Sequence, residues 1–185
     1  MGPLAKAVFL DRDGVINEER GFVHTPEQFA FLPGAVNALR DLQAAGYLLV
    51  IVTNQSGIAR GLYTEDDYVR LMTHVREQLH AAGVRLDDVR HCPHLPDAPV
   101  QRYRLDCNCR KPKPGMLTSA IAALNIDASA SILIGDRGSD LRAGRAAGVG
   151  RCYLIANDYS VNDADRAEAD AVCESMGDCV RLILG

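Results

Sequence analysis

Tryptophan is absent from the chain, and aromatic residues make up only 5% of its 185 residues. No apolar run approaches the ~20 residues that a bilayer-crossing helix needs, and acidic residues follow the start too soon for a secretory signal. We therefore expect a cytoplasmic protein that does not bind a membrane. Neither sign of charge dominates, with 20 basic and 24 acidic residues and a net charge of −4, which disfavours nucleic acid as a partner.

The chain is rich enough in apolar residues, at 48%, to bury a core, and its length predicts a single domain over residues 1–185. Short apolar segments alternate with segments of helical periodicity. The predicted strands cover residues 6–10, 47–52, 88–91, 131–134 and 152–155. The predicted helices lie between 33 and 46, between 64 and 83, over 115–124 and 140–147, and from 175 onward. This alternation predicts an α/β fold, a three-layer, doubly wound parallel sheet with helices on both faces.

Polar residues follow several of these strands, and such folds bind their ligands at the carboxyl ends of strands. Asp11 and Asp13 come directly after the first strand. Residues i and i+2 of an extended chain project to the same side, so both carboxylates can face one pocket while Arg12 points away. Two close carboxylates suit a Mg²⁺ site, or a nucleophile paired with an acid. An isolated motif of this kind is more often a solvated turn.

Other strand ends carry complementary groups. Thr53, Asn54, Gln55 and Ser56 follow the second strand and offer hydroxyl and amide groups that suit phosphate oxygens. Arg110, Lys111 and Lys113 form a basic cluster in a net acidic chain, and either lysine can be the one that enters the pocket. Asp136 follows the fourth strand, and Asp140 lies one helical turn later, where it can also cap a helix.

Six cysteines fall into two groups. Cys92, Cys107 and Cys109 crowd one segment with His94, and this set of three thiolates and one imidazole matches tetrahedral Zn²⁺. Four protein ligands close the coordination sphere, so this zinc is predicted to be structural and to stabilise the loop over about residues 92–109. His91 lies outside the pattern. The scattered Cys152, Cys173 and Cys179 are predicted to be small buried residues.

The order of these motifs resembles that of the haloacid dehalogenase (HAD) superfamily of phosphotransferases, with a match from residue 8 to about 148. The resemblance implies a two-step phosphoryl transfer in which Asp11 is the nucleophile, Asp13 the general acid and base, and Thr53 and Lys111 hold the transferring oxygens. It also implies that Asp11, the backbone carbonyl of Asp13 and Asp136 bind a catalytic Mg²⁺, with Asp140 in support.

Within the superfamily, the CPH and CRKPKPGM segments are similar to a branch that contains heptose-bisphosphate phosphatases and histidinol-phosphate phosphatases. Several longer segments favour the heptose enzymes, which act on a small sugar phosphate. The family's substrate contacts would fall on residues Glu19, Arg20, Gly21, Phe22, Asn54, Gln55, Ser56, Arg110 and Arg137. Arginines 110 and 137 are suited to a second phosphate group.

The segments between Asp11 and Thr53 and between Thr53 and Lys111 are each filled by one predicted helix and a loop. They leave no room for a large cap domain, so we expect an open site and a monomer. Two other hypotheses remain. One is a histidinol-phosphate phosphatase with the same catalytic groups, and the other is an inactive, zinc-dependent binding module.

Overall fold

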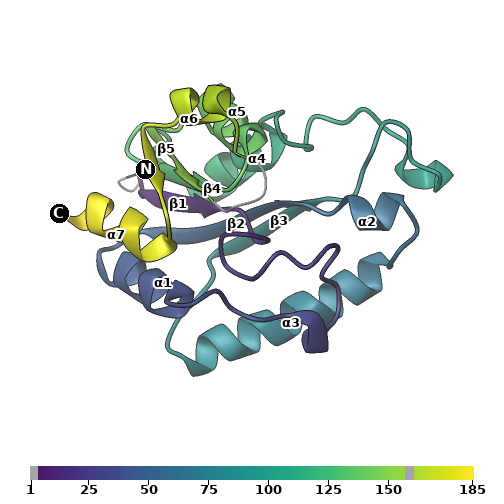
Figure 1. Cartoon of the computed structure of the whole chain (residues 1–185), viewed down its shortest axis with the longest axis horizontal. Helices are drawn as coiled ribbons and strands as arrows, with labels where there is room; N and C mark the ends of the chain where they lie inside the picture. The colour runs from purple at the N-terminus through teal and green to yellow at the C-terminus, as the bar shows by residue number, and fades with distance from the viewer. Residues whose placement is uncertain (1–3, 157–160) are drawn as a thin grey trace.

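Six parallel strands form the centre of the protein in the computed structural model, which describes residues 4–156 and 161–185 (Figure 1). The strands are β1 (Ala7–Leu10), β2 (Leu48–Asn54), β3 (Asp88–Cys92), β4 (Ile132–Gly135), β5 (Arg151–Ile155) and β6 (Ala171–Cys173). Their order in the sheet is β3-β2-β1-β4-β5-β6. Strands β1 and β4 are buried along their whole length, as expected where helices cover both faces of a parallel sheet.

One face of the sheet is covered by α1 (Ala35–Ala44), α3 (Glu65–Ala81) and α7 (Met176–Leu184). Figure 1 shows these three helices together below the sheet. The start of α3 carries a capping box: the Asp67 N–H donates to Thr64 Oγ1 over 3.1 Å, and the Thr64 N–H donates to Asp67 Oδ2 over 2.7 Å. These bonds satisfy backbone donors that the first turn of a helix leaves without partners.

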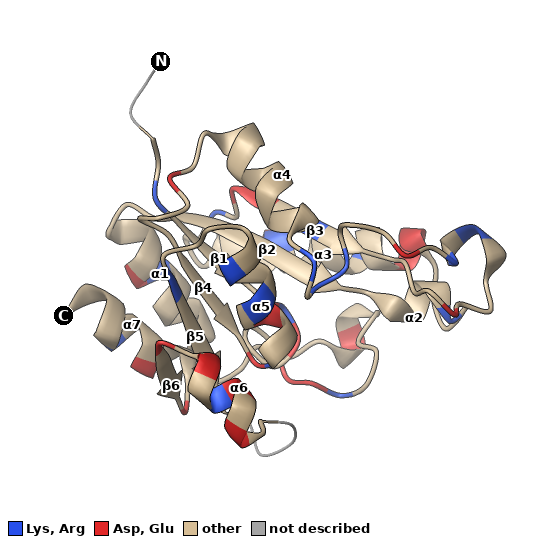
Figure 2. Cartoon of the chain, turned by 90° about the horizontal axis from the view of Figure 1, so that it is seen from above, with Lys and Arg blue, Asp and Glu red and all other residues tan. Residues whose placement is uncertain are grey.

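The opposite face is covered by α4 (Gly115–Leu124) and α5 (Gly138–Ala146), with α6 (Asp163–Glu168) packed beside α5. Helices α5 and α6 carry opposite charges where they pack together. Figure 2 shows basic segments of α5 in blue and acidic segments of α6 in red. Arg142 Nη1 lies 3.1 Å from Asp165 Oδ1 and 3.2 Å from Glu168 Oε2. The sheet therefore has helices on both faces, as predicted, with α1 and α3 opposite α4 and α5.

The short elements were not predicted from the sequence. They are α2 (Ser56–Ala59), α6, β6 and two 3₁₀ turns at Pro26–Gln28 and Gln101–Tyr103. Each spans too few residues to show a hydrophobic period, and α6 is almost entirely polar. The prediction for Cys152, Cys173 and Cys179 is confirmed, since all three are buried. Among the described residues, no helix is long and apolar enough to span a membrane.

The direction of the sheet connections reverses between β1 and β4. From β1 the chain adds β2 and then β3 on one side, and it later adds β4, β5 and β6 on the other. In an open α/β sheet, the carboxyl ends of the strands at such a reversal flank a crevice that binds ligands. Asp11 follows β1 and Asp136 follows β4, so two of the predicted metal ligands stand at this position.

Candidate active site and metal centre

Three carboxylates and one lysine converge at the carboxyl end of the sheet. Oxygen atoms of Asp11, Asp136 and Asp140 all lie within 4.8 Å of one another. Lys111 Nζ lies 3.0 Å from Asp11 Oδ1 and 2.7 Å from Asp140 Oδ1, and it donates to the Val52 carbonyl over 2.7 Å. The structure thus places Lys111 in the cluster. Lys113 is exposed and pairs with Asp106 instead.

The loop that carries Lys111 is held at the end of β2 by hydrogen bonds to the Lys111 backbone. The Lys111 N–H donates to Asn54 Oδ1, and Asn54 Nδ2 donates to the Lys111 carbonyl, each over 3.1 Å. The Gln55 N–H, next to Asn54, donates to the Cys92 carbonyl over 2.8 Å. The end of β2 therefore holds the lysine loop and the start of the cysteine-rich loop together.

Burial and like charges shift the titration of this cluster. Burial, together with the Asp140 and Asp13 carboxylates, raises the pKa of Asp11 to about 6, although Lys111 opposes the shift. Burial and the Asp11 and Asp140 carboxylates raise the pKa of Asp136 to about 8. Burial alone would lower the pKa of Lys111, but the Asp11 and Asp140 carboxylates raise it. The site thus concentrates negative charge that a divalent cation would stabilise.

The donor atoms fit a hard divalent cation such as Mg²⁺. Asp136 Oδ1 is buried and accepts no hydrogen bond from the residues that the structure describes, and Arg137 Nε lies 3.9 Å away. Both bonds to the Asp11 carboxylate go to Oδ1, from Lys111 and from the Arg12 N–H. An orphaned, buried carboxylate oxygen is costly unless a cation meets it, and oxygen ligands are those that Mg²⁺ prefers.

Asp140 plays a supporting part in this cluster. Its Oδ1 atom lies against Lys111, and its Oδ2 atom accepts from the Arg137 N–H over 3.1 Å at the start of α5. Asp140 therefore both contacts the cluster, through Lys111, and caps a helix, the two arrangements that the sequence left open. Its two oxygens are already occupied, which leaves the orphaned Asp136 oxygen as the better metal ligand.

The Asp140 side chain needs a glycine beside it. A Cβ atom built on Gly135 would lie 2.3 Å from Asp140 Cβ, a separation that requires the start of α5 to move. We expect Gly135→Ala to lower the free energy of unfolding by about 1–3 kcal/mol. Urea denaturation measures this effect. The control is Gly177→Ala in α7, where the new Cβ would meet no atom closer than 3.6 Å and stability should stay the same or rise by up to about 1 kcal/mol. Equal stability losses in both variants would contradict the explanation.

A cavity of about 750 Å³ opens beside this cluster. It is lined by all four predicted catalytic residues, Asp11, Asp13, Thr53 and Lys111. Eight of the predicted substrate contacts also line it: Glu19, Gly21, Phe22, Asn54, Gln55, Ser56, Arg110 and Arg137. Arg20 does not line it, because its guanidinium pairs with Glu18 Oε2 on the exposed side of the loop. The strand ends that the sequence marked as polar thus meet around one cavity.

Sequence reasoning missed three lining residues, Arg60, Tyr63 and Ser139. Tyr63 donates its hydroxyl to Gln55 Oε1 over 2.6 Å, and Gln55 Nε2 donates to Thr53 Oγ1 over 2.8 Å. Because the Thr53 oxygen accepts this bond, its hydroxyl hydrogen can be donated to a ligand in the cavity. Ser139 lies within the segment between Asp136 and Asp140, which was a signal in the sequence. Arg60 and Tyr63 carried none.

The side chain of Arg12 points away from the cavity, as predicted. It is fully buried, and its guanidinium reaches back to the neighbouring Asp13 carboxylate at 2.9 Å, a contact that was not predicted. Alternation along an extended chain does not apply beyond Asp11, because the backbone turns there: the Arg12 carbonyl accepts the N–H groups of residues 15, 16 and 17. This turn lets two adjacent side chains meet.

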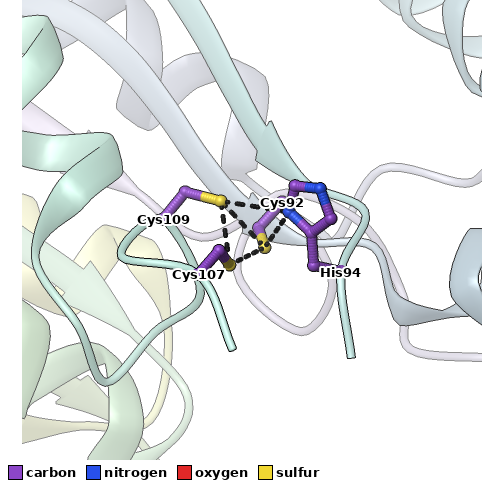
Figure 3. Close-up of side chains that lie close together, drawn as sticks. All are labelled: Cys92, His94, Cys107 and Cys109. Carbon is purple, nitrogen blue, oxygen red and sulfur yellow. Dashed lines mark hydrogen bonds between the residues drawn. The ribbon is translucent and has the colours of Figure 1, made fainter. Parts of the chain in front are cut away.

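The second candidate metal centre is the cysteine and histidine cluster. Figure 3 shows Cys92, His94, Cys107 and Cys109 facing one another. The sulfur–sulfur distances are 3.1, 3.2 and 3.4 Å, and His94 Nδ1 lies 3.5 Å from Cys109 Sγ. These cysteines are not joined by disulfides, and the four candidate ligand atoms all lie within 4.8 Å of one another, a set that fits a tetrahedral Zn²⁺. His91 is outside the cluster and pairs with Glu65.

Comparison with known proteins agrees with this geometry. A HAD-hydrolase-like family model matches residues 108–179. The D-glycero-beta-D-manno-heptose-1,7-bisphosphate 7-phosphatase of Pasteurella multocida is 44% identical over 182 residues, covering 98% of each chain. This chain belongs to that phosphatase family. The member from Escherichia coli K12 is 42% identical over 183 residues, covering 99% of this chain and 96% of the relative.

A solved structure of a heptose phosphatase shares the fold. The D,D-heptose 1,7-bisphosphate phosphatase from B. bronchiseptica, complexed with magnesium and phosphate, superposes with a TM-score of 0.83. It is 31% identical, and the match covers 97% of this chain and 98% of that one. The HAD-like fold predicted from the sequence is therefore confirmed, and the described residues contain no large cap domain.

Proposed function

We propose that this chain is a magnesium-dependent phosphatase that removes the 7-phosphate of D-glycero-D-manno-heptose 1,7-bisphosphate. The observation that carries the proposal is the Asp11 carboxylate beside the buried, unpartnered Asp136 oxygen, at the mouth of a cavity lined by three arginines. Phosphoryl transfer requires positioning and charge neutralisation more than other chemistry. The names of the relatives supply the identity of the sugar and its beta anomer.

In the proposed mechanism, a carboxylate oxygen of Asp11 attacks phosphorus, and the bond between phosphorus and the sugar oxygen breaks. Asp13 donates a proton to the departing alkoxide. In the second step Asp13 takes a proton from a water molecule, which attacks the aspartyl phosphate and releases inorganic phosphate. The proton given in the first step is thereby recovered, and Asp11 is regenerated.

Other residues hold the reacting groups. The Thr53 hydroxyl donates to a transferring oxygen. Lys111 already uses its three donors on Asp11, Asp140 and the Val52 carbonyl, so it must exchange one of them to contact a phosphate. Magnesium, when bound by Asp11, Asp136 and the Asp13 carbonyl, supplies divalent positive charge against the phosphate and the carboxylates.

The distal phosphate of the substrate would meet the arginines of the cavity. Arg137 is more than half exposed and lies 3.6 Å from Glu19 Oε2, while Arg110 donates to the His94 carbonyl over 3.3 Å. Guanidinium groups bind phosphate through paired hydrogen bonds. We expect Arg110→Ala or Arg137→Ala to raise KM for the bisphosphate by about 10-fold, the effect of losing one charged contact.

The same substitutions should change KM for a small monophosphate such as p-nitrophenyl phosphate by less than about 2-fold. Steady-state kinetics with both substrates measures the difference. The matched control is Arg102→Ala. Arg102 lies in the loop that precedes Arg110 but outside the cavity, so both KM values should stay unchanged. A similar rise for both substrates would contradict a distal-phosphate role.

The substrate assignment is tested by comparing the bisphosphate with histidinol phosphate, both in the presence of Mg²⁺. A histidinol site needs a carboxylate for the substrate's amine, and Glu19 is the cavity carboxylate that is remote from the metal site. It is already engaged by Arg137 and by the Gly21 N–H, which favours the bisphosphate. A higher kcat/KM for histidinol phosphate would overturn the assignment, and no turnover of either substrate would favour a binding module.

We also propose that the protein acts as a cytoplasmic monomer in the supply of nucleotide-activated heptose for lipopolysaccharide core synthesis. The residues of this chain that line the cavity already include every predicted catalytic residue, which supports a site that needs no partner subunit. Size-exclusion chromatography with light scattering tests whether the protein is a monomer.

A further inference from the structure

Arg12 is an unusual residue for its position. It lies between the two carboxylates that follow β1, yet its side chain has no exposed surface. A buried guanidinium carries a full charge, since arginine stays protonated in proteins. Such a charge requires a partner, because an unpaired buried ion is strongly destabilising. The partner here is Asp13.

The contact between the two side chains uses both carboxylate oxygens. Arg12 Nη2 lies 2.9 Å from Asp13 Oδ1 and 2.9 Å from Oδ2, and Arg12 Nε lies 3.3 Å from Oδ1. The same Nη2 atom donates to the Val23 carbonyl over 2.8 Å, and the guanidinium lies 5.9 Å from the ring centre of Tyr68. The arginine is therefore itself fixed on several sides while it holds the carboxylate.

Two other donors reach Asp13, but neither has this geometry. Asn17 Nδ2 donates to Oδ1 over 2.9 Å, and Gln55 Nε2 donates to Oδ2 over 3.3 Å. Each contacts a single oxygen, and neither one alone prevents the carboxylate from rotating. The guanidinium fork contacts both oxygens and so defines the plane of the carboxylate.

We propose that Arg12 is a positioning residue that orients Asp13 for proton transfer to the leaving oxygen of the substrate. This inference rests on the proposed function, which assigns acid and base chemistry to Asp13. A catalytic acid must lie within hydrogen-bond reach of the oxygen that it protonates, and small errors of position reduce the rate steeply. Asp13 lines the cavity with Asp11, whereas Arg12 is fully buried and does not line it.

The test compares two substrates that differ in their need for an acid. The heptose alkoxide is a poor leaving group and requires a proton, whereas p-nitrophenolate leaves without one. The measured quantity is the ratio of kcat/KM for p-nitrophenyl phosphate to kcat/KM for the heptose bisphosphate. Because kcat/KM includes only the steps through departure of the alcohol, hydrolysis of the aspartyl phosphate does not affect it.

Loss of a general acid costs about 10²–10⁴-fold in rate, so Asp13→Asn should raise this ratio by about 10²-fold or more. Arg12→Lys keeps the charge but loses the fork, and we expect it to raise the ratio by about 10-fold. Arg12→Gln should raise it further. Asn17→Ala leaves the fork in place and should leave the ratio within about 2-fold of wild type.

Each result decides between the two proposals. If Asp13→Asn lowers both kcat/KM values equally, the acid role of Asp13 in the proposed function fails, and the inference fails with it. If Asp13→Asn raises the ratio but the folded Arg12 variants do not, only the inference is overturned. Should neither Arg12 variant fold by circular dichroism, Asn17→Ala decides: a ratio as high as that of Asp13→Asn would show that Arg12 does not suffice to orient the carboxylate, and an unchanged ratio supports the inference.

Discussion

Replacement of Asp11 by asparagine should abolish phosphate release while leaving the protein folded. The amide has the size of the carboxylate, but it is a poor nucleophile and cannot form an aspartyl phosphate. We expect kcat to fall by about 10⁴-fold or more, as when other covalent nucleophiles are removed. The fold should persist, because the substitution removes a charge from a group of three crowded carboxylates.

Turnover of the bisphosphate and trapping with fluoroberyllate together check this expectation. The wild-type protein should retain one fluoroberyllate on Asp11 in the presence of Mg²⁺, and the variant should retain none. The matched control is Asp106→Asn, because this carboxylate is exposed and pairs with Lys113 away from the cavity. Phosphate release by Asp11→Asn at a tenth of the wild-type rate would exclude Asp11 as the nucleophile.

Removal of zinc should unfold the loop over residues 92–109 and inactivate the enzyme. Structural zinc sites bind with about 10–16 kcal/mol of apparent free energy, which stabilises the fold. The loop has few apolar residues to replace that contribution, and Cys107 and Cys109 are only half-buried. Arg110 and Lys111 follow Cys109 directly, so disorder of the loop would release the lysine from Asp11.

Metal analysis should find about one zinc per chain in the purified protein, and chelation should lower both Tm and activity. The variant Cys109→Ser should lose the zinc, whereas Cys152→Ala, which changes a buried cysteine outside the cluster, should keep it. Adding Mg²⁺ alone to the chelated protein should not restore turnover. Zinc loss without any change in Tm and in Mg²⁺-dependent activity would refute a structural role.

Much of the fold could be predicted from local patterns. Strand β1 is a short apolar run that stops at Asp11, and α4 begins and ends at the predicted residues, Gly115 and Leu124. Helix α3 lies within the predicted range of 64 to 83, and Thr64 is its N-cap. In these segments the hydrophobic periodicity and the residues that begin or end an element indicate the same boundaries. The element can therefore be predicted without knowledge of the tertiary structure.

The rest of the site depends on contacts between distant segments. Arg60 and Tyr63 line the cavity from the segment that follows α2, where Tyr63 contacts Gln55, and a four-residue helix shows no hydrophobic period. The contact of Arg12 with Asp13 was not predicted, because alternation assumes an extended backbone and β1 ends at Leu10. The choice between Lys111 and Lys113 also needed the structure, since both lysines lie in the same proline-rich segment.

The backbone bond between the Asp11 N–H and the Ile134 carbonyl, 3.0 Å long, continues the pairing of β1 with β4 past the end of the strand. Adjacent strands lie about 4.8 Å apart in any sheet. This spacing therefore sets the distance between Asp11 and Asp136, which follow β1 and β4. Insertions in the surface loops can therefore alter which sugar is admitted without disturbing the spacing on which the ion depends. A lineage could diversify its substrates while inheriting the same reactive centre.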